Sequence, residues 1–230
     1  MKTTRPRQGR PRHTPPSDPH TSARDQILDA AGALFVEHGI AATSTRMIAE
    51  RVGIRQASLY YHFATKDEIL AELLATSVRP SLEMVERIHG WVPERASAAA
   101  ALYAVAATDV RTLSRTPYNI GTLYLLPEVL AAGRFDAFRA DRERLQEGYG
   151  RIGTLAATQD VVRGLPPERI GELLIQLVEV VIQIRRSREP DAADTDAIAS
   201  SCVRLCGLDE AALAAARDEA HSLLKRLRRP

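Results

Sequence analysis

The 230-residue chain lacks the features of several large classes of protein. Aromatic residues make up only 5% of it and it has two cysteines, so we expect neither a sheet-rich core nor a disulfide framework. No apolar run approaches the roughly 20 residues that a membrane span needs, and no stretch near the N-terminus has the pattern of a signal peptide. The composition therefore favours a helical protein of the cytoplasm.

Catalytic and metal-binding motifs are also missing from the sequence. It contains no Gly-rich phosphate loop, no HExxH and no GxSxG, and its six histidines are scattered without ligand spacing. Cys202 and Cys206 lie four residues apart, on one face of a predicted helix. We interpret them as small buried thiols, with a redox or metal role as the alternative. The prediction is a protein that is not an enzyme and uses neither a cofactor nor a metal.

Charge is concentrated at the N-terminus. Residues 1–21 hold five basic side chains against Asp18 alone, whereas the whole chain has a net charge of only +2. The same segment has five prolines and almost no large apolar side chain, so we expect it to be a disordered basic arm. A basic arm on a nearly neutral body indicates a polyanionic partner.

One short pattern in this arm is compatible with DNA. The segment 8–12 resembles the Gly-Arg-Pro core of AT-hook peptides, and Arg10 and Arg12 are its basic residues. Extended Arg-Pro segments fit the narrow minor groove of A·T-rich DNA. A non-specific electrostatic tail explains the same residues, and both interpretations stay open.

Residues 22–68 predict a compact module of short helices. A first helix begins after Ser22 and ends at Gly39; its apolar stripe is Ile27, Ala30, Ala31, Leu34 and Phe35. A second begins at residue 44 or 45, and Gly53 permits a tight, left-handed turn to a third helix over residues 56–62. Thr65 and Glu68 form a capping box for a fourth.

Residues 69–230 predict longer helices and a larger bundle. We expect helices from about Pro93 to Ser114, 134–157, 166–186, 197–206 and 209–227, with residues 191–196 as a polar connection. The predicted fold is all-α, with an N-terminal helix-turn-helix module of three helices and a C-terminal bundle. The Val/Ile-rich helix over 166–186 has apolar residues on two sides, which predicts that it needs more than one packing partner.

The segment between Ser44 and Phe63 has the residues of a helix-turn-helix. Ala49 is small where two helices would cross, Gly53 occupies the turn, and Leu59 anchors the second helix from behind. Gln56 and Tyr60 lie four residues apart on the opposite, outward side. Tyrosine hydroxyls on a helix in a DNA groove are well placed to donate to phosphate.

Three neighbouring residues extend this pattern. Thr45 and Arg46 open the supporting helix, where the backbone N–H groups and the helix dipole attract an anion. Lys66 lies in the first turn of the fourth helix, where a cation opposes the dipole. A DNA phosphate between the lysine and those N–H groups would account for its position.

The residues 43–54, 57–63 and Lys66 resemble the signature of the tetracycline-repressor (TetR) family, over about 50 residues. The resemblance implies an Ω-shaped homodimer with a variable C-terminal ligand domain. One departure is Arg55, where family members often have a small helix cap such as Ser, so we expect Arg55 to contact phosphate instead. Together with Arg55, the positions that the resemblance implies as DNA contacts are Thr45, Arg46, Gln56, Ala57, Ser58, Tyr60, Tyr61, His62 and Lys66.

The resemblance is only architectural beyond about Val78, and it identifies no ligand. Aromatic side chains at helical spacing are more often core than ligand contacts. Gln176 and Glu179 interrupt an apolar helix, where either could orient a ligand or pair across a dimer. The candidate ligand contacts are Tyr103, Tyr118, Tyr124, Phe135, Phe138, Tyr149, Gln176 and Glu179.

The sequence thus predicts a cytoplasmic, homodimeric transcription regulator, released from a near-palindromic DNA operator by a small-molecule effector. Its domains would be a basic arm (1–21), a DNA-binding module (22–68) and a ligand-binding and dimerisation bundle (69–230). The helices at about 166–186 and 195–206 would form the intersubunit four-helix bundle. Two alternatives stay open: an effector-independent activator or chromosome-organising factor, and a helical small-molecule-binding protein or enzyme with a vestigial helix-turn-helix.

Overall fold

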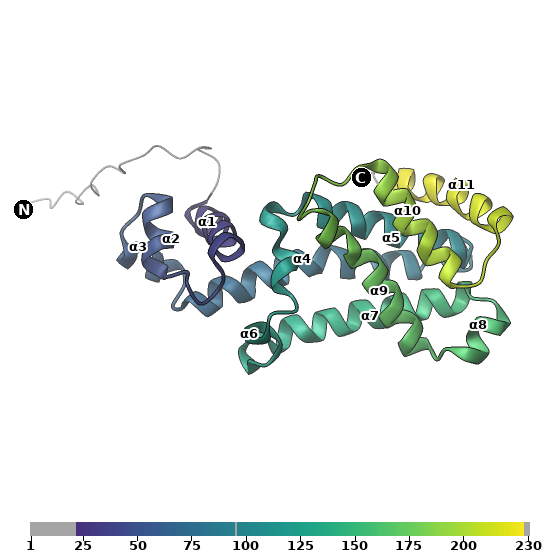
Figure 1. Cartoon of the computed structure of the whole chain (residues 1–230), viewed down its shortest axis with the longest axis horizontal. Helices are drawn as coiled ribbons and strands as arrows, with labels where there is room; N and C mark the ends of the chain where they lie inside the picture. The colour runs from purple at the N-terminus through teal and green to yellow at the C-terminus, as the bar shows by residue number, and fades with distance from the viewer. Residues whose placement is uncertain (1–21, 95, 228–230) are drawn as a thin grey trace, which may run out of the picture. The chain divides into compact units, whose positions relative to one another are not determined.

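The computed structural model of the chain describes residues 22–94 and 96–227, and these residues form helices and turns with no strand (Figure 1). The chain divides into two compact units, one ending at Glu72 and the other beginning at Leu73. The prediction of an all-α fold is confirmed. No helix in the described ranges is long and apolar enough to cross a membrane.

The first unit contains α1 (Ala23–His38), α2 (Thr45–Val52), α3 (Gln56–His62) and the beginning of α4 (Lys66–His89). The hydroxyl of Ser22 accepts from the backbone N–H of Asp25 at 3.1 Å and donates to its carboxylate at 2.7 Å, which caps α1. The predicted stripe of α1 is buried throughout, and Gly39 ends the helix with a φ of +86°. Burial of this stripe against α2 forms much of the unit's small core.

Two local signals set the directions of the next helices. Gly53 adopts the left-handed conformation (φ +74°), which a side chain would strain, and the N–H of Ile54 returns to the carbonyl of Ala49 at 3.0 Å. At the start of α4, the hydroxyl of Thr65 accepts from the N–H of Glu68 at 3.1 Å. The Glu68 carboxylate accepts from Ala64 rather than from Thr65, one residue earlier than in a standard capping box.

The second unit is built around α5 (Ala98–Arg115). This helix packs against α7 (Asp136–Ala156), α9 (Pro167–Ile184), α10 (Ala192–Leu205) and α11 (Glu210–Leu227). Six of its buried residues are alanine or valine between positions 100 and 107, and these small side chains allow neighbours on several sides. Short segments join the long helices: η1 (Pro117–Leu123), α6 (Pro127–Leu130), η2 (Gly133–Phe135) and α8 (Gln159–Gly164).

Helices α7 and α9 approach each other closely at glycines. A Cβ on Gly171 would lie 2.4 Å from the carbonyl oxygen of Gln146, and one on Gly150 would lie 2.6 Å from that of Pro167. Both distances are too short for any side chain, so glycine is required at this crossing. Cys202 and Cys206 are buried nearby in the second unit, as predicted, and burial raises the pKa of each thiol to about 12.

The predicted start of α10 was wrong. Asp191, expected to begin a polar connection, is the N-cap of a helix that starts at Ala192, five residues earlier than predicted. Asp191 and Asp194 each accept a hydrogen bond from the other's backbone N–H at 2.9 Å. The acidic residues that indicated a loop form a capping box. Helix α8 was not predicted.

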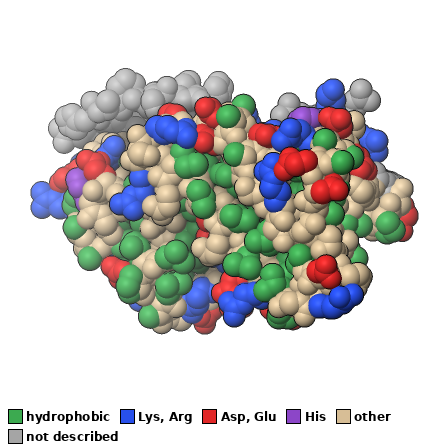
Figure 2. Space-filling model, turned by 45° about the vertical axis from the view of Figure 1, so that its right-hand side comes forward, with side chains coloured by type: hydrophobic (Ala, Val, Ile, Leu, Met, Phe, Trp, Pro, Cys, Tyr) green, Lys and Arg blue, Asp and Glu red, His purple; other side chains and the backbone are tan. Residues whose placement is uncertain are grey.

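One side of α9 leaves apolar residues at the surface. Leu173 and Val180 are 36% and 44% exposed, and Leu177 and Ile184 are partly exposed. Their spacing of four, three and four residues places all four on one face of the helix. Figure 2 shows many hydrophobic side chains at the surface, between separate groups of charged ones.

Candidate functional site

The outward face of α3 is polar and exposed, while its inner face is buried. Leu59 and Phe63 are 0% and 2% exposed, whereas Tyr60 is 48% and Tyr61 88% exposed. The exposed face also includes Arg55, Gln56, Ala57 and Ser58. Because a seven-residue helix cannot be stable alone, the two buried anchors hold it in place, and its outer side chains need not contribute to the core.

Three of the predicted DNA-contacting side chains form a hydrogen-bonded group across α2 and α3. The amide of Gln56 donates to the hydroxyl of Thr45 at 2.9 Å and to that of Tyr60 at 3.4 Å. The hydroxyls of Thr45 and Tyr60 lie 3.1 Å apart. These contacts orient the polar ends of all three side chains, and because the group is exposed, water or a ligand can replace each contact at little cost.

The beginnings of both helices add backbone donors. Ser44 caps α2 by accepting from the N–H of Met47 at 3.2 Å, but the first N–H groups of a helix have no intrahelical partner. Arg55 occupies the N-cap of α3 without a side-chain cap hydrogen bond, as the sequence predicts. Its exposed guanidinium and that of Arg46, which pairs with Glu50 at 2.8 Å, add positive charge beside these N–H groups.

The end of α3 is held by an arginine that the sequence did not single out. Arg24 donates to the carbonyl of His62 at 2.8 Å, pairs with Glu72 and stacks over the ring of Phe63 at 4.0 Å. The ring of His62 lies edge-on to that of Tyr61 at 5.3 Å. Arg24 therefore ties α1, α3 and α4 together from a position 38 residues before His62.

Lys66 has partners within the first unit. Its ammonium donates to the carbonyl oxygens of Ile40 at 2.6 Å and Thr43 at 2.7 Å, in the loop between α1 and α2. These two carbonyls stabilise a cation at the start of α4 despite the unfavourable helix dipole. The position of Lys66 thus has an explanation that needs no phosphate, and its predicted DNA contact stays a prediction. Arg10 and Arg12 lie outside the described residues.

The second unit encloses a polar cluster around Asp109 of α5. The carboxylate is 4% exposed and accepts from the hydroxyls of Ser81 at 2.5 Å and Tyr149 at 2.9 Å. Burial raises the pKa of Asp109 to about 6, and the two hydroxyl donors oppose that rise. Burial also raises the pKa of Tyr149 well above its usual value, so this phenol stays protonated and remains a donor.

A small cavity of about 10 Å³ lies beside Asp109, with room for roughly one water molecule. Arg142 of α7 forms a two-contact ion pair with Glu179 of α9 and lies 4.9 Å from the centre of the Tyr124 ring. Tyr124 donates to the hydroxyl of Ser77 at 2.8 Å. The lining residues are Ser77, Val78, Ser81, Asp109, Leu113, Tyr124, Arg142, Leu145, Ile175 and Glu179.

The structure brings only some of the predicted ligand contacts to this cavity. Tyr124 and Glu179 line it. Tyr149 does not line it but donates to Asp109, and Phe138 packs against Tyr124 with ring centres 5.3 Å apart. The sequence missed Ser81, Asp109 and Arg142. Asp109 could have been identified from the sequence, because it is a lone carboxylate in a helix rich in alanine and valine. Arg142 lies among other charged residues, so the sequence does not distinguish it.

The other four predicted ligand contacts lie elsewhere. Tyr103 is buried and donates to Asp196 at 2.5 Å, between α5 and α10. Phe135 is 1% exposed, beside Arg134. Tyr118 is 38% exposed in η1, and Gln176 points outward from α9. None of these four lines the cavity beside Asp109.

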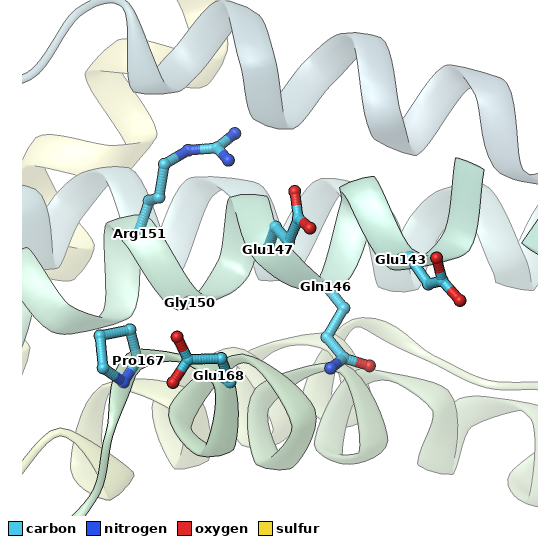
Figure 3. A pocket seen from close by; sticks show the side chains of 7 residues that line it. All are labelled: Glu143, Gln146, Glu147, Gly150, Arg151, Pro167 and Glu168. Atoms are coloured by element: carbon cyan, nitrogen blue, oxygen red, sulfur yellow. The ribbon is translucent and has the colours of Figure 1, made fainter. Parts of the chain in front are cut away.

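A second hollow, of about 420 Å³, is an open groove between α7 and α9 (Figure 3). Glu143 and Glu147 of α7 and Glu168 of α9 lie along it, together with Gln146 and Arg151. The groove lies where Gly150 brings the two backbones together. We explain it as a consequence of that close approach. No group of three or more His, Cys, Asp or Glu side chains in the described chain is placed to hold a metal ion.

Comparisons with known proteins agree with the arrangement of α2 and α3 described above. Residues 27–73 match the family model described as bacterial regulatory proteins, tetR family. The repressor KstR2 of Mycobacterium tuberculosis (strain CDC 1551 / Oshkosh) is 49% identical over 53 residues, which cover 23% of this chain and 26% of KstR2. The chain thus matches only about a quarter of the length of such curated relatives.

Solved structures match over most of the chain. The crystal structure of Mycobacterium smegmatis AmtR is 42% identical, with a TM-score of 0.76 over 91% of this chain and 98% of AmtR. AibR, solved in complex with isovaleryl coenzyme A and operator DNA, is 19% identical, with a TM-score of 0.62 over 78% of this chain and 95% of AibR. At 19% identity, the match to AibR shows a similar fold and nothing more.

Proposed function

Because the chain belongs to the tetR family of bacterial regulatory proteins, we propose that it is a homodimeric transcription repressor which a small-molecule effector releases from its operator. The observation that carries the proposal is the outward face of α3. Tyr60 and Tyr61 are exposed on a helix whose inner residues are fully buried, and two adjacent exposed tyrosines are costly unless they meet a partner.

In this proposal α3 enters the major groove and α2 supports it against the backbone. Gln56 presents an amide that can bind an adenine edge through two hydrogen bonds, and Tyr60 donates to a phosphate oxygen. Thr45, which now bonds to both, would exchange these contacts for phosphate. Arg46 would reach a base edge and Arg55 a phosphate, with Ala57, Ser58, Tyr61, His62 and Lys66 completing the contact surface.

The apolar stripe of α9 supports dimerisation. Leu173, Leu177, Val180 and Ile184 lie at the surface of the single chain, and an isologous four-helix bundle of α9 and α10 from two subunits would bury them. The dimer axis would then place the two copies of α3 one helical turn of DNA apart, ~34–36 Å or a multiple of it. The operator should accordingly be near-palindromic.

Val180→Lys tests the dimer. A charge in the middle of the stripe should weaken association by at least tenfold and with it the affinity for DNA, as followed by light scattering and gel shift. The matched control is Glu168→Lys, which places a lysine at an exposed position on another face of the same helix. Equal loss of association in both variants would remove the stripe from the interface.

Paired substitutions on α3 test DNA recognition, using the DNA upstream of the protein's own gene. Tyr60→Phe removes a phosphate donor and should weaken binding to all sequences alike, by about 2- to 10-fold. Gln56→Ala removes a base contact and should instead change the preference at one base pair. If Gln56→Ala weakened binding to operator and scrambled DNA equally, the amide would not read a base.

The alternative is a DNA-binding protein that has no effector. The small size of the cavity beside Asp109 favours this alternative, because about 10 Å³ has room for roughly one water molecule. Ligand screening by thermal shift distinguishes the two, since a compound that binds the native state raises its melting temperature. Compounds that both raise this temperature and release the DNA would support the effector-controlled repressor.

A further inference from the structure

The cluster around Asp109 has more negative charge than its neighbours neutralise. Asp109 receives only hydroxyl donors, from Ser81 and Tyr149, and no basic side chain in the described part of the chain forms an ion pair with it. Arg142, a cation whose charge acts on Asp109, donates to both carboxylate oxygens of Glu179. The cavity therefore holds a neutral pair and one buried carboxylate without a counter-ion.

The two members of this pair act on the pKa of Asp109 in opposite directions. Glu179 raises the pKa of Asp109 and Arg142 lowers it, with the larger contribution from Glu179. Burial is the main cause of the raised value of about 6, at which the carboxyl is still mostly ionised near neutral pH. A buried charge without a counter-ion is costly, and a cation placed beside it would remove most of that cost.

We propose that the cavity beside Asp109 is the subsite for the charged end of the effector, and that this end is an organic monocation such as an alkylammonium or a guanidinium. The inference rests on the proposed function, because it describes the effector of that regulator. Asp109 accepts the ligand's N–H groups, while Ser77 and Ser81, which also line the cavity, supply further oxygens. Val78, Leu113, Leu145 and Ile175 provide an apolar lining for its carbon chain.

The cavity must enlarge to admit such a molecule, and the segment before Tyr124 is suited to move. In η1, Tyr118 and Asn119 have φ values of +59° and +53°, a conformation that non-glycine residues rarely adopt. The side-chain oxygen of Asn119 is buried without a hydrogen-bond partner in the described chain. A shift of η1 that carries Tyr124 off Ser77 would relieve this strain and open the cavity toward Asp109.

A set of four probes of equal chain length tests the charge preference. The full-length protein is heated with n-butylammonium, n-butylguanidinium, 1-butanol or butyrate at constant ionic strength. The two cations should raise the melting temperature by about 3–6 °C at ten times their Kd, and the alcohol and the anion should not. A larger shift with butyrate or butanol than with the cations would overturn the proposal, as would no shift with any of the four.

Substitutions then locate the site. Asp109→Asn should weaken cation binding at least tenfold, whereas Tyr149→Phe should strengthen it several-fold, because the carboxylate loses a competing donor. Asp196→Asn is the matched control: Asp196 also accepts from a tyrosine, but it has Arg217 as a counter-ion, so binding should change less than twofold. Parallel weakening in Asp109→Asn and Tyr149→Phe would indicate a structural role alone and overturn the proposal.

Gel shift with the upstream DNA separates this inference from the function on which it rests. Absence of DNA binding without any amine would refute the proposed function, and the thermal shifts do not depend on DNA. Release of the DNA by the two cations, lost in Asp109→Asn, would support the effector site. Binding of the cations through Asp109 with no change in DNA affinity would show that the cavity is not the effector site.

Discussion

The two units use polar side chains in opposite ways. In the first, Thr45, Gln56 and Tyr60 meet at the surface, where each contact can be exchanged for water or a ligand. In the second, Ser81, Asp109 and Tyr149 meet in the core, where an unpaired group would be costly. The surface group is therefore accessible to a large partner without rearrangement, whereas the buried group becomes accessible to a ligand only after the protein opens.

The largest change in stability is expected for Leu59→Ala, which removes a buried side chain that holds the exposed face of α3 in place. Leu59 is fully buried on the inner side of α3, so its truncation should lower the free energy of unfolding by about 2–5 kcal/mol. Tyr61→Ala, two residues away at an 88% exposed position, should change it by less than about 0.5 kcal/mol. Urea unfolding followed by circular dichroism measures both. Similar losses would mean that α3 is not anchored by its inner face.

A second test uses the pH dependence of Asp109. Its pKa is raised from 3.8 to about 6, so between these values the folded protein holds more protons than the unfolded chain and its stability falls as pH rises. The groups facing it are Ser81 of α4, Arg142 and Tyr149 of α7, Glu179 of α9 and Cys202 of α10.

Asp109→Asn should remove this dependence. The unfolding free energy of the variant relative to the unmodified protein should rise by about 2–3 kcal/mol from pH 4 to pH 7, since each pKa unit corresponds to about 1.4 kcal/mol. Urea titrations at the two pH values supply the comparison. Parallel pH profiles would show that the carboxyl is solvated in the folded protein.

Lys66→Met tests whether Lys66 stabilises the fold of the first unit or contacts a DNA phosphate. The loss of its hydrogen bonds to the carbonyls of Ile40 and Thr43 should destabilise the first unit by about 1–3 kcal/mol. The control is Arg55→Met, at an exposed N-cap, which should leave stability unchanged and reduce the salt dependence of DNA binding by about one phosphate contact. A Lys66 variant of unchanged stability with the same reduced salt dependence would make Lys66 a phosphate contact only.

The smallest change in stability is expected for Arg46→Ala. Its ion pair with Glu50 is exposed, and such pairs contribute roughly 0–1 kcal/mol. The DNA preference should nevertheless change at one base pair, which binding to a panel of single-base operator variants would show. An unchanged base preference across the panel would show that Arg46 does not contact a base.

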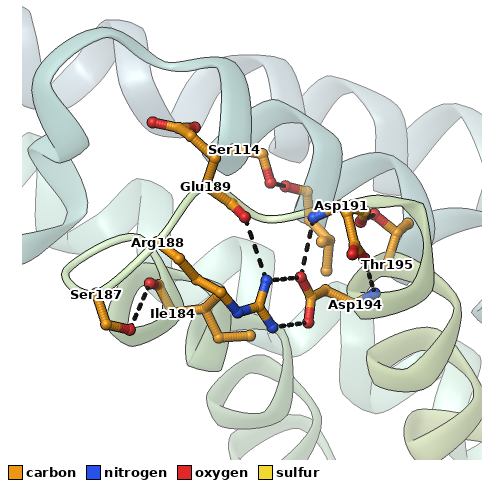
Figure 4. Close-up of polar contacts among 9 residues, drawn as sticks. Ser114, Ile184, Ser187, Arg188, Glu189, Asp191, Asp194 and Thr195 are labelled. Atoms are coloured by element: carbon orange, nitrogen blue, oxygen red, sulfur yellow. Dashed lines mark hydrogen bonds and ion pairs between the residues drawn. The ribbon is translucent and has the colours of Figure 1, made fainter.

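Local signals in the sequence predicted most of the helix boundaries. Ser22, Gly39, Gly53 and Thr65 each act within a few residues through a cap or a turn, and the structure has each of them in that role. Asp191 and Asp194 are local signals too, but the polar composition of residues 191–196 predicts a loop, whereas these two residues cap a helix. Figure 4 shows why a helix forms there: Asp191 and Asp194 accept from each other's backbone N–H groups, and Arg188 binds the Asp194 carboxylate through two 2.6 Å contacts. Arg188 also lowers the pKa of Asp194 to about 2.

By itself the sequence determined the helical fold, the turn at Gly53 and the outward face of α3, because caps, turn conformations and helical periodicity act over a few residues. Only the tertiary structure decided which polar groups meet inside the second unit. Asp109, Arg142 and Glu179 lie on three helices that are far apart in the chain. Their proximity results from side chains packing across the bundle, and no periodicity within a single helix encodes it.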